Sequence, residues 1–127
     1  MAQLYNWSSK SILIADDDLI NFELLKLMLR QTGVDIHHVT NGQNAINAIE
    51  KDKSTDLVIM DIQMPVVDGI QATVKLREME YNGIIFALTA LNTFKDIAKY
   101  KSKGFDEIVE KPVRREVFLK LIDKYLG

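Results

Sequence analysis

The chain has no cysteine among its 127 residues. It can therefore form no disulfide, and it offers no thiolate as a metal ligand, redox group or nucleophile. Long hydrophobic runs are also missing: none approaches the roughly 20 apolar residues of a membrane-spanning helix, and no signal-peptide pattern opens the chain. These absences predict a soluble, cytoplasmic protein that does not associate with membranes.

Neither sign of charge dominates, since 16 basic residues stand against 18 acidic ones. A DNA-binding module relies on a broad positive field, so we expect no direct contact with nucleic acid. The length fits one domain. Residues 1–9 are interpreted as an N-terminal tail or linker and residues 10–127 as the folded domain, and the sequence leaves open whether Trp7 docks on that domain. Proline is rare too, and Pro65 and Pro112 are each expected to have a defined structural role.

Short apolar runs alternate with longer stretches of helical spacing. The runs predict strands at residues 11–15, 35–40, 56–60, 83–88 and 105–109, the second and last being weaker and typical of edge strands. The helical stretches are residues 19–30, 43–50, 70–79, 94–101 and 117–125. Five successive strand–helix units predict an α/β fold in which a parallel sheet lies between two layers of helices.

Ligands of such sheets bind beyond the carboxyl ends of the strands. Asp16, Asp17, Asp61, Thr89 and Lys111 follow strands in this way and are expected to meet at one edge. Three carboxylates there would raise one another's pKa, and a hard divalent cation such as Mg²⁺ would relieve the repulsion. A carboxylate nucleophile, a cation, an ammonium and a hydroxyl together indicate phosphoryl transfer to an aspartate. The neighbouring Asp18 is better explained as a helix N-cap.

Four stretches in this order resemble the response regulator receiver domain of two-component signalling. They are Ile12-Leu13-Ile14-Ala15-Asp16-Asp17, Met60-Asp61-Ile62-Gln63-Met64-Pro65-Val66-Val67-Asp68-Gly69, Leu88-Thr89-Ala90 and Glu110-Lys111-Pro112. The resemblance implies a three-layer, doubly wound (βα)5 flavodoxin-like fold with strand order 2-1-3-4-5. It further implies a switch that takes a phosphoryl group from a phosphohistidine in a phosphorelay, and so a signalling protein and not a turnover enzyme.

The resemblance also implies roles for individual residues. Asp61 would be the phosphoacceptor, and Mg²⁺, with Mn²⁺ as an alternative, would be held by Asp16, Asp17, Asp61 and the backbone carbonyl of Gln63. Thr89 and Lys111 would contact the phosphoryl oxygens. Pro65, Gly69 and Pro112 would shape the loops, and the Lys111–Pro112 peptide bond is a candidate for the cis form.

One position departs from the family pattern. Ile108 stands where an aromatic switch residue is usual, so we expect Thr89 and the loop after it to carry the conformational change. Gln63 and Leu91 are expected to flank the path of the water that hydrolyses the aspartyl phosphate. His37 and His38 are interpreted as surface histidines of an edge strand, because adjacent strand residues face opposite ways.

The resemblance implies a sensor histidine kinase or a histidine phosphotransfer domain as partner, and the receiver of a hybrid kinase with an attached kinase module is one form. Partner choice would depend on surface residues such as Asn21, Leu24, Leu25 and Val113. A homodimer would use the face of the fourth helix, fifth strand and fifth helix. Two alternatives are an aspartate-nucleophile phosphatase of the haloacid-dehalogenase type, in which an Asp would stand at Gln63, and a degenerate receiver that only binds partners.

Overall fold

The computed structural model describes residues 5–90 and 93–127, which form a five-stranded parallel sheet covered by helices on both faces. The strands are β1 (Ser11–Ala15), β2 (Asp35–Val39), β3 (Leu57–Asp61), β4 (Ile84–Thr89) and β5 (Glu107–Glu110). The helices are α1 (Leu19–Leu29), a short 3-10 turn η1 (Arg30–Thr32), α2 (Gly42–Lys51), α3 (Gly69–Glu78), α4 (Phe94–Ser102) and α5 (Arg115–Leu126). None of these helices is long and apolar enough to cross a membrane.

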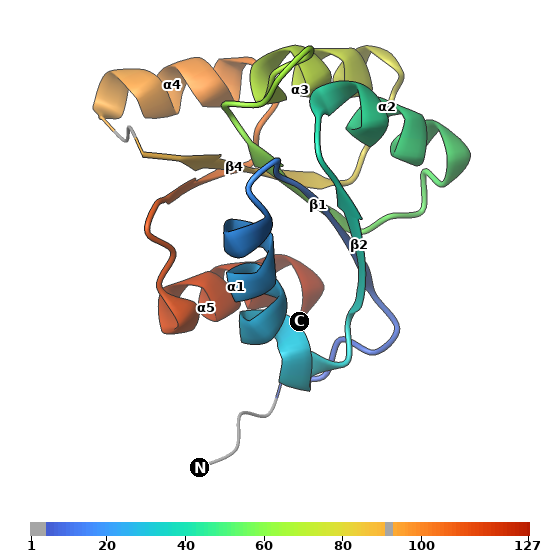
Figure 1. Ribbon diagram of the computed structural model, residues 1–127, viewed down its shortest axis with the longest axis vertical. Coiled ribbons are helices and arrows are strands. Elements are labelled where there is room, and N and C mark those ends of the chain that lie inside the picture. The colour runs from blue at the N-terminus through green and yellow to red at the C-terminus, as the bar shows by residue number, and fades with distance from the viewer. Residues whose placement is uncertain (1–4, 91–92) are drawn as a thin grey trace.

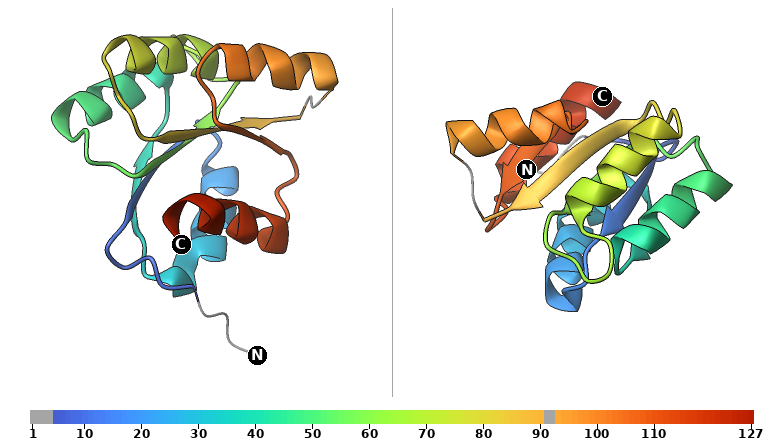
Figure 2. Two further views of the ribbon diagram at one scale, coloured as in Figure 1. Left: turned by 180° about the vertical axis from the view of Figure 1, so that it is seen from behind. Right: turned by 90° about the horizontal axis from the view of Figure 1, so that it is seen from above.

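The strands lie in the order β2-β1-β3-β4-β5, which confirms the predicted topology. Helices α1 and α5 cover one face of the sheet, and α2, α3 and α4 cover the other (Figures 1 and 2). The outer strands β2 and β5 are the least buried, as their mixed sequences predicted.

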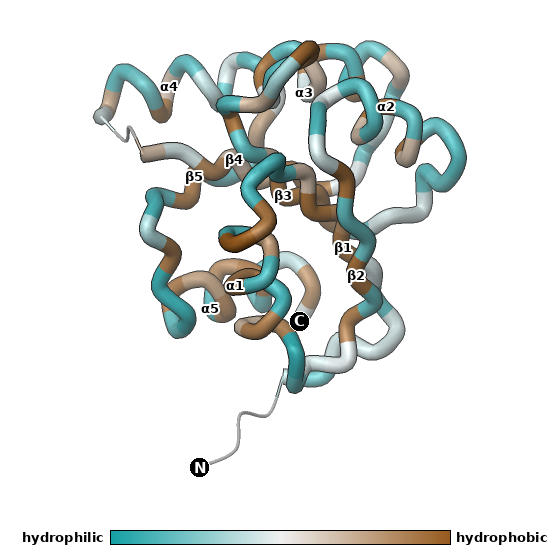
Figure 3. The backbone as a smooth tube through the Cα atoms, viewed as in Figure 1, coloured by the Kyte–Doolittle hydropathy of each residue, from teal (hydrophilic) through white to brown (hydrophobic). Residues whose placement is uncertain are grey.

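Alternation along the strands divides the core into two layers. Ile12 and Ile14 point toward α1 and α5, whereas Leu13 and Ala15 point toward the other helices. The same alternation runs through β3 and β4, whose residues are buried almost throughout. Apolar residues therefore concentrate in the middle of the sheet (Figure 3), where burial on both faces supplies most of the stabilising free energy.

Trp7 is docked on the domain. Its side chain is 2% exposed and belongs to the core layer under α1 and α5. Its backbone N–H donates to the carbonyl of Thr32 at 2.8 Å, and its ring stacks on Tyr5 at 5.1 Å between centroids. The segment before β1 is thus packed against the far end of α1.

Three of the predicted strands, β3, β4 and β5, end one residue before the observed strands do. We expected β3 to end at Met60 and β4 at Leu88, but the strands include Asp61 and Thr89. The reason is that the backbone pairing continues: Ile62 N–H donates to the Leu88 carbonyl at 3.1 Å, and Lys111 N–H donates to the Thr89 carbonyl at 2.9 Å. Asp61 and Thr89 are therefore held by the sheet itself, not by a loop.

Candidate functional site

Three aspartates gather at the carboxyl edge of the sheet. One carboxylate oxygen from each of Asp16, Asp17 and Asp61 lies within 4.8 Å of the other two. Asp16 directly follows β1 and Asp61 ends β3, so the pairing of these two central strands brings them together. Asp16 is 0% and Asp61 4% exposed, whereas Asp17 is exposed. The cluster is therefore a buried pair of carboxylates with a third, solvent-exposed carboxylate beside it.

Lys111 approaches this cluster from the end of β5. Its Nζ lies 3.2 Å from Oδ1 of Asp61, and the backbone N–H of Gln63 donates to the same oxygen at 3.3 Å. Within residues 5–90 and 93–127, these two are the hydrogen bonds that the side-chain carboxylate of Asp61 accepts, and both use Oδ1. Among these residues, Oδ2 of the Asp61 carboxylate accepts no hydrogen bond.

The Asp61 carboxyl is harder to ionise than an ordinary one. The pKa of this carboxyl is raised from 3.8 to about 6, first by burial and second by the negative charge of Asp16, while Lys111 and the N–H of Gln63 act in the opposite direction. Repulsion among the carboxylates was predicted, but burial is the larger cause. At pH 7 Asp61 is still mainly ionised and so able to act as a nucleophile.

Thr89 and Lys111 lie next to each other beside Asp61. Thr89 ends β4, is 6% exposed, and its carbonyl accepts the backbone N–H of Lys111. Leu88, the residue before it, is the register partner of Asp61. Leu91, which we expected to line the path of the hydrolytic water, lies outside the described residues.

The loop after β3 is fitted closely around the Asp61 backbone. A Cβ on Gly69 would lie 2.2 Å from the Asp61 carbonyl oxygen, so only glycine fits there. Pro65 accepts a turn hydrogen bond from Val67 N–H at 2.8 Å, and Asp68 caps α3. The Lys111–Pro112 peptide bond is cis, as the sequence suggested.

Two residues near the cluster make contacts that the sequence did not predict. Asn21, expected on a partner-facing surface, donates its side-chain amide to Oδ2 of Asp16. His38, expected to be a surface residue, contacts the Asp16 carbonyl through Nε2 at 2.9 Å and stacks on Phe22. His37 is exposed and pairs with Asp35, in agreement with the prediction. The sequence does not reveal the contacts of Asn21 and His38, because they join β1, β2 and α1, which only the folded chain brings together.

Other predicted positions have simpler outcomes. Asp18 caps α1 and accepts from Ile20 and Asn21 N–H, as predicted. Leu25 is fully buried in the core and cannot face a partner, whereas Leu24 is 50% exposed. Ile108 is partly buried and packs against the core layer on the side of α2, α3 and α4.

The donor set suits a hard divalent cation. Three carboxylate oxygens within 4.8 Å of one another are ligands that Mg²⁺ prefers, and the chain has no thiolate that would favour a softer metal. The carboxylates available to hold the ion are those of Asp16, Asp17 and Asp61. The fit rests on the chemistry of these groups and on their closeness.

Comparisons with known proteins agree with this geometry. The sequence profile described as the response regulator receiver domain matches residues 12–123. The chain is 30% identical over 132 residues to hybrid signal transduction histidine kinase B of Dictyostelium discoideum, covering 93% of this chain but 7% of that protein. It is also 30% identical over 117 residues to two-component response regulator 24 of Arabidopsis thaliana, covering 92% of this chain and 84% of that protein.

Two solved structures of receiver domains are similar to the whole fold. The first is a Saccharomyces cerevisiae co-crystal of the histidine phosphotransfer protein Ypd1 with the receiver domain of Ssk1 (TM-score 0.89, 29% identity, covering 98% of this chain and 92% of that one). The second is the receiver domain of sensor histidine kinase PA1611 from Pseudomonas aeruginosa, with a magnesium ion in the active-site cleft (TM-score 0.84, 28% identity, covering 93% and 98%).

Proposed function

Because this chain belongs to the response regulator receiver domain family of two-component systems, we propose that it accepts a phosphoryl group on Asp61. The observation that carries the proposal is the placement of Asp61: a buried carboxylate at a strand end, with Lys111 on one oxygen and two further aspartates beside it. Receiver domains are signalling phosphoacceptors. We propose the same role here, and not that of an enzyme that turns over many substrate molecules.

In the proposed transfer, Oδ2 of Asp61 attacks the phosphorus atom of a phosphohistidine. A P–O bond forms, the P–N bond breaks, and the imidazole nitrogen keeps its electron pair. Lys111 and the Thr89 hydroxyl stabilise charge on the phosphoryl oxygens. A bound Mg²⁺ supplies charge neutralisation for the carboxylates and the incoming group. Asp17, Asp61 and the Gln63 carbonyl would hold the ion directly and Asp16 through water, with Mn²⁺ able to replace it.

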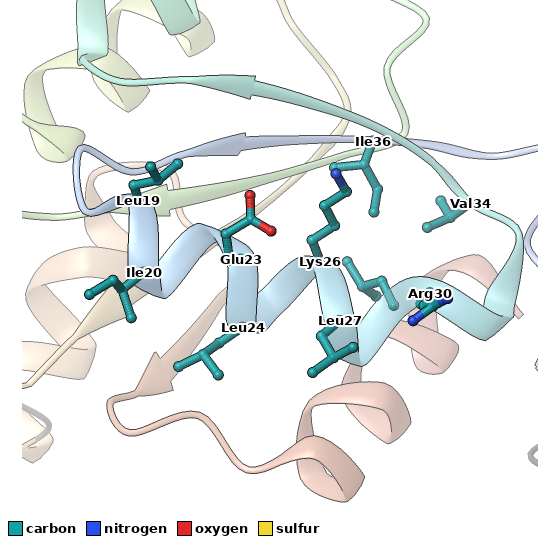
Figure 4. Close-up of a pocket in the computed structure, with 10 residues that line it drawn as sticks. Leu19, Ile20, Glu23, Leu24, Lys26, Leu27, Arg30, Val34 and Ile36 are labelled. Carbon is teal, nitrogen blue, oxygen red and sulfur yellow. The ribbon is translucent and has the colours of Figure 1, made fainter.

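Helix α1 offers the surface on which a phosphodonor protein would dock. Its outer face exposes Leu19, Ile20, Leu24 and Leu27 by half or more of their surface (Figure 4). The helix begins three residues after Asp16. Such a patch on a soluble domain indicates a protein interface. We propose that the donor is a histidine phosphotransfer domain or a sensor histidine kinase.

Several further assignments rest on the family. The chain spans 7% of the length of the hybrid kinase above, so attachment to a kinase module is part of the proposal. The receiver unit would be residues 10–127, with 1–9 as the incoming linker, and its location would be cytoplasmic. Thr89 and the loop after it would carry the switch, since Ile108 has no ring to move. Any homodimer would use the face of α4, β5 and α5.

The direct test is incubation with acetyl phosphate and Mg²⁺, followed by intact-mass measurement. We expect one added phosphoryl group on the parent, none on Asp61→Asn, and one on the matched control Asp18→Asn, which keeps the helix cap. No addition to the parent, or equal addition to Asp61→Asn, would contradict the proposal.

The docking surface is tested with a phosphorylated histidine phosphotransfer protein as donor. Leu24→Asp should slow transfer from the protein donor and leave labelling by acetyl phosphate unchanged. Phe94→Asp is the control, because Phe94 is 94% exposed but lies on α4, which covers the opposite face of the sheet (Figure 1). Equal slowing by both variants would argue against α1 as the docking surface. Release of phosphate over many turnovers would instead favour the phosphatase alternative.

A further inference from the structure

Every polar atom of Asp16 has a partner within the protein. Its backbone N–H donates to the Val39 carbonyl at 3.0 Å, and its own carbonyl accepts from Nε2 of His38 at 2.9 Å. Its Oδ1 accepts the backbone N–H of Asp18 at 2.9 Å, and its Oδ2 accepts the side-chain amide of Asn21. The residue is 0% exposed, so this network, and not water, determines where the carboxylate points.

Asn21 is the one member of this network that binds the carboxylate through a side chain. It lies in the first turn of α1, half-buried, and its amide reaches back over the Asp18 cap to Asp16. The histidine on the other side is fixed as well, because its ring stacks on Phe22 with centroids 3.8 Å apart and planes 3° apart. Asp16 is therefore held between β2 and α1.

An uncharged hydrogen-bond donor at position 21 has an electrostatic advantage over a cationic one. Three carboxylates within 4.8 Å of one another repel, so an unrestrained Asp16 side chain would turn away from the other two. A lysine in place of Asn21 would hold the carboxylate but would also repel a divalent cation. An amide dipole holds it without adding a positive charge.

We propose that Asn21 is a positioning residue for the cation site, which holds the Asp16 carboxylate ready for a divalent metal ion and thereby sets the affinity for Mg²⁺. The inference rests on the proposed function, because it assumes that this cluster is the metal site of the phosphorylation reaction. It adds a residue outside the acidic, threonine and lysine positions, and it makes the first turn of α1 part of the site.

The test is Mg²⁺ titration of the full 127-residue chain, followed by NMR through the amides of Asp17 and Gln63. Asn21→Leu removes the donor at similar size, and we expect about a 10- to 100-fold weaker affinity for Mg²⁺. Asn21→Gln keeps an amide, so we expect this variant to retain most of the Mg²⁺ affinity of the parent. Asn47→Leu, which removes an exposed amide contact with Gln43 on α2, should leave the affinity unchanged.

A fold defect is separated from a positioning defect by urea unfolding read through Trp7, which lies at the opposite end of α1. The double variant Asp16→Asn/Asn21→Leu supplies the second readout: if the amide acts through Asp16, adding Asn21→Leu to Asp16→Asn should cost no further affinity. An Asn21→Leu affinity within twofold of the parent, or additive losses in the double variant, would overturn the inference. Since the parent is measured alongside, failure of the parent to bind Mg²⁺ would overturn both this inference and the proposed function, whereas an unaffected Asn21→Leu overturns this inference alone.

Discussion

Ionised Asp61 should destabilise the folded chain, and the size of the effect can be calculated from its pKa. Burial, reinforced by the charge of Asp16, raises that pKa from 3.8 to about 6. At about 1.4 kcal/mol for each tenfold change in proton affinity, the ionised form costs about 3 kcal/mol of unfolding free energy. Asp61→Asn removes this charge and keeps the shape of the side chain, so in the absence of divalent ions it should stabilise the protein.

The stabilisation by Asp61→Asn should increase as the pH rises. Between about pH 4 and pH 6 the folded chain binds the Asp61 proton more tightly than the unfolded chain does, so stability falls as the pH rises through this interval. Well above pH 6 Asp61 is ionised in both the folded and the unfolded chain, so the destabilisation by its charge has reached its full size. Asp61→Asn should therefore be close to neutral at pH 4 and more stable than the parent by about 3 kcal/mol at pH 8.

The assay is urea unfolding in a chelator at both pH values, followed by the fluorescence of Trp7, the single tryptophan and a buried one. Asp52→Asn is a control of opposite sign, because hydrogen bonds from Ser54 lower the pKa of this exposed carboxyl and its charge stabilises the fold above that pKa. Added Mg²⁺ should stabilise the parent more than Asp61→Asn and so narrow the gap. An Asp61→Asn effect that is equal at pH 4 and pH 8, or a loss at pH 8, would refute the reasoning.

Two further predictions concern stability away from the site. Trp7→Ala should lower the unfolding free energy by about 3–5 kcal/mol, because it empties a buried volume beneath α1; a loss below 1 kcal/mol in urea unfolding would show that the segment before β1 is not part of the folded core. Thr73→Val should be neutral or stabilising by about 1 kcal/mol, since within the described part of the chain the buried Thr73 hydroxyl has no hydrogen-bond partner. A marked loss of stability in the same assay would show that the hydroxyl is satisfied in solution.

The sequence predicted what depends on local pattern and strand order. Regular alternation of apolar runs and helices was sufficient for the topology, because parallel strands with helical crossovers have few alternative arrangements. The same rule placed Asp16, Asp61 and Lys111 at one edge, where the structure has them. The Asp18 cap was also readable, because it depends on residues two and three positions away.

Contacts between distant segments were not readable. Helix α1 is apolar almost all round, so its pattern does not reveal that Leu25 faces the core while Leu24 faces solvent. Asn21 and His38 carry no motif, and their link to Asp16 exists only because β1, β2 and the first turn of α1 meet. Trp7 was undecided for the same reason, since its partner Thr32 lies at the far end of α1.

The incomplete neutralisation of Asp61 is itself part of how such a site would work. Lys111 is 31% exposed along its side chain and touches one oxygen of Asp61 at 3.2 Å, so its charge offsets only part of the cost of burial. A closer, fully buried pairing would lower the pKa of Asp61 further and make its oxygens weaker nucleophiles. It would also remove the excess negative charge that favours a divalent cation. In the proposed phosphoacceptor site, about 3 kcal/mol of unfavourable electrostatic free energy would therefore keep the Asp61 carboxylate reactive, while the Asn21 amide holds Asp16 without adding a positive charge.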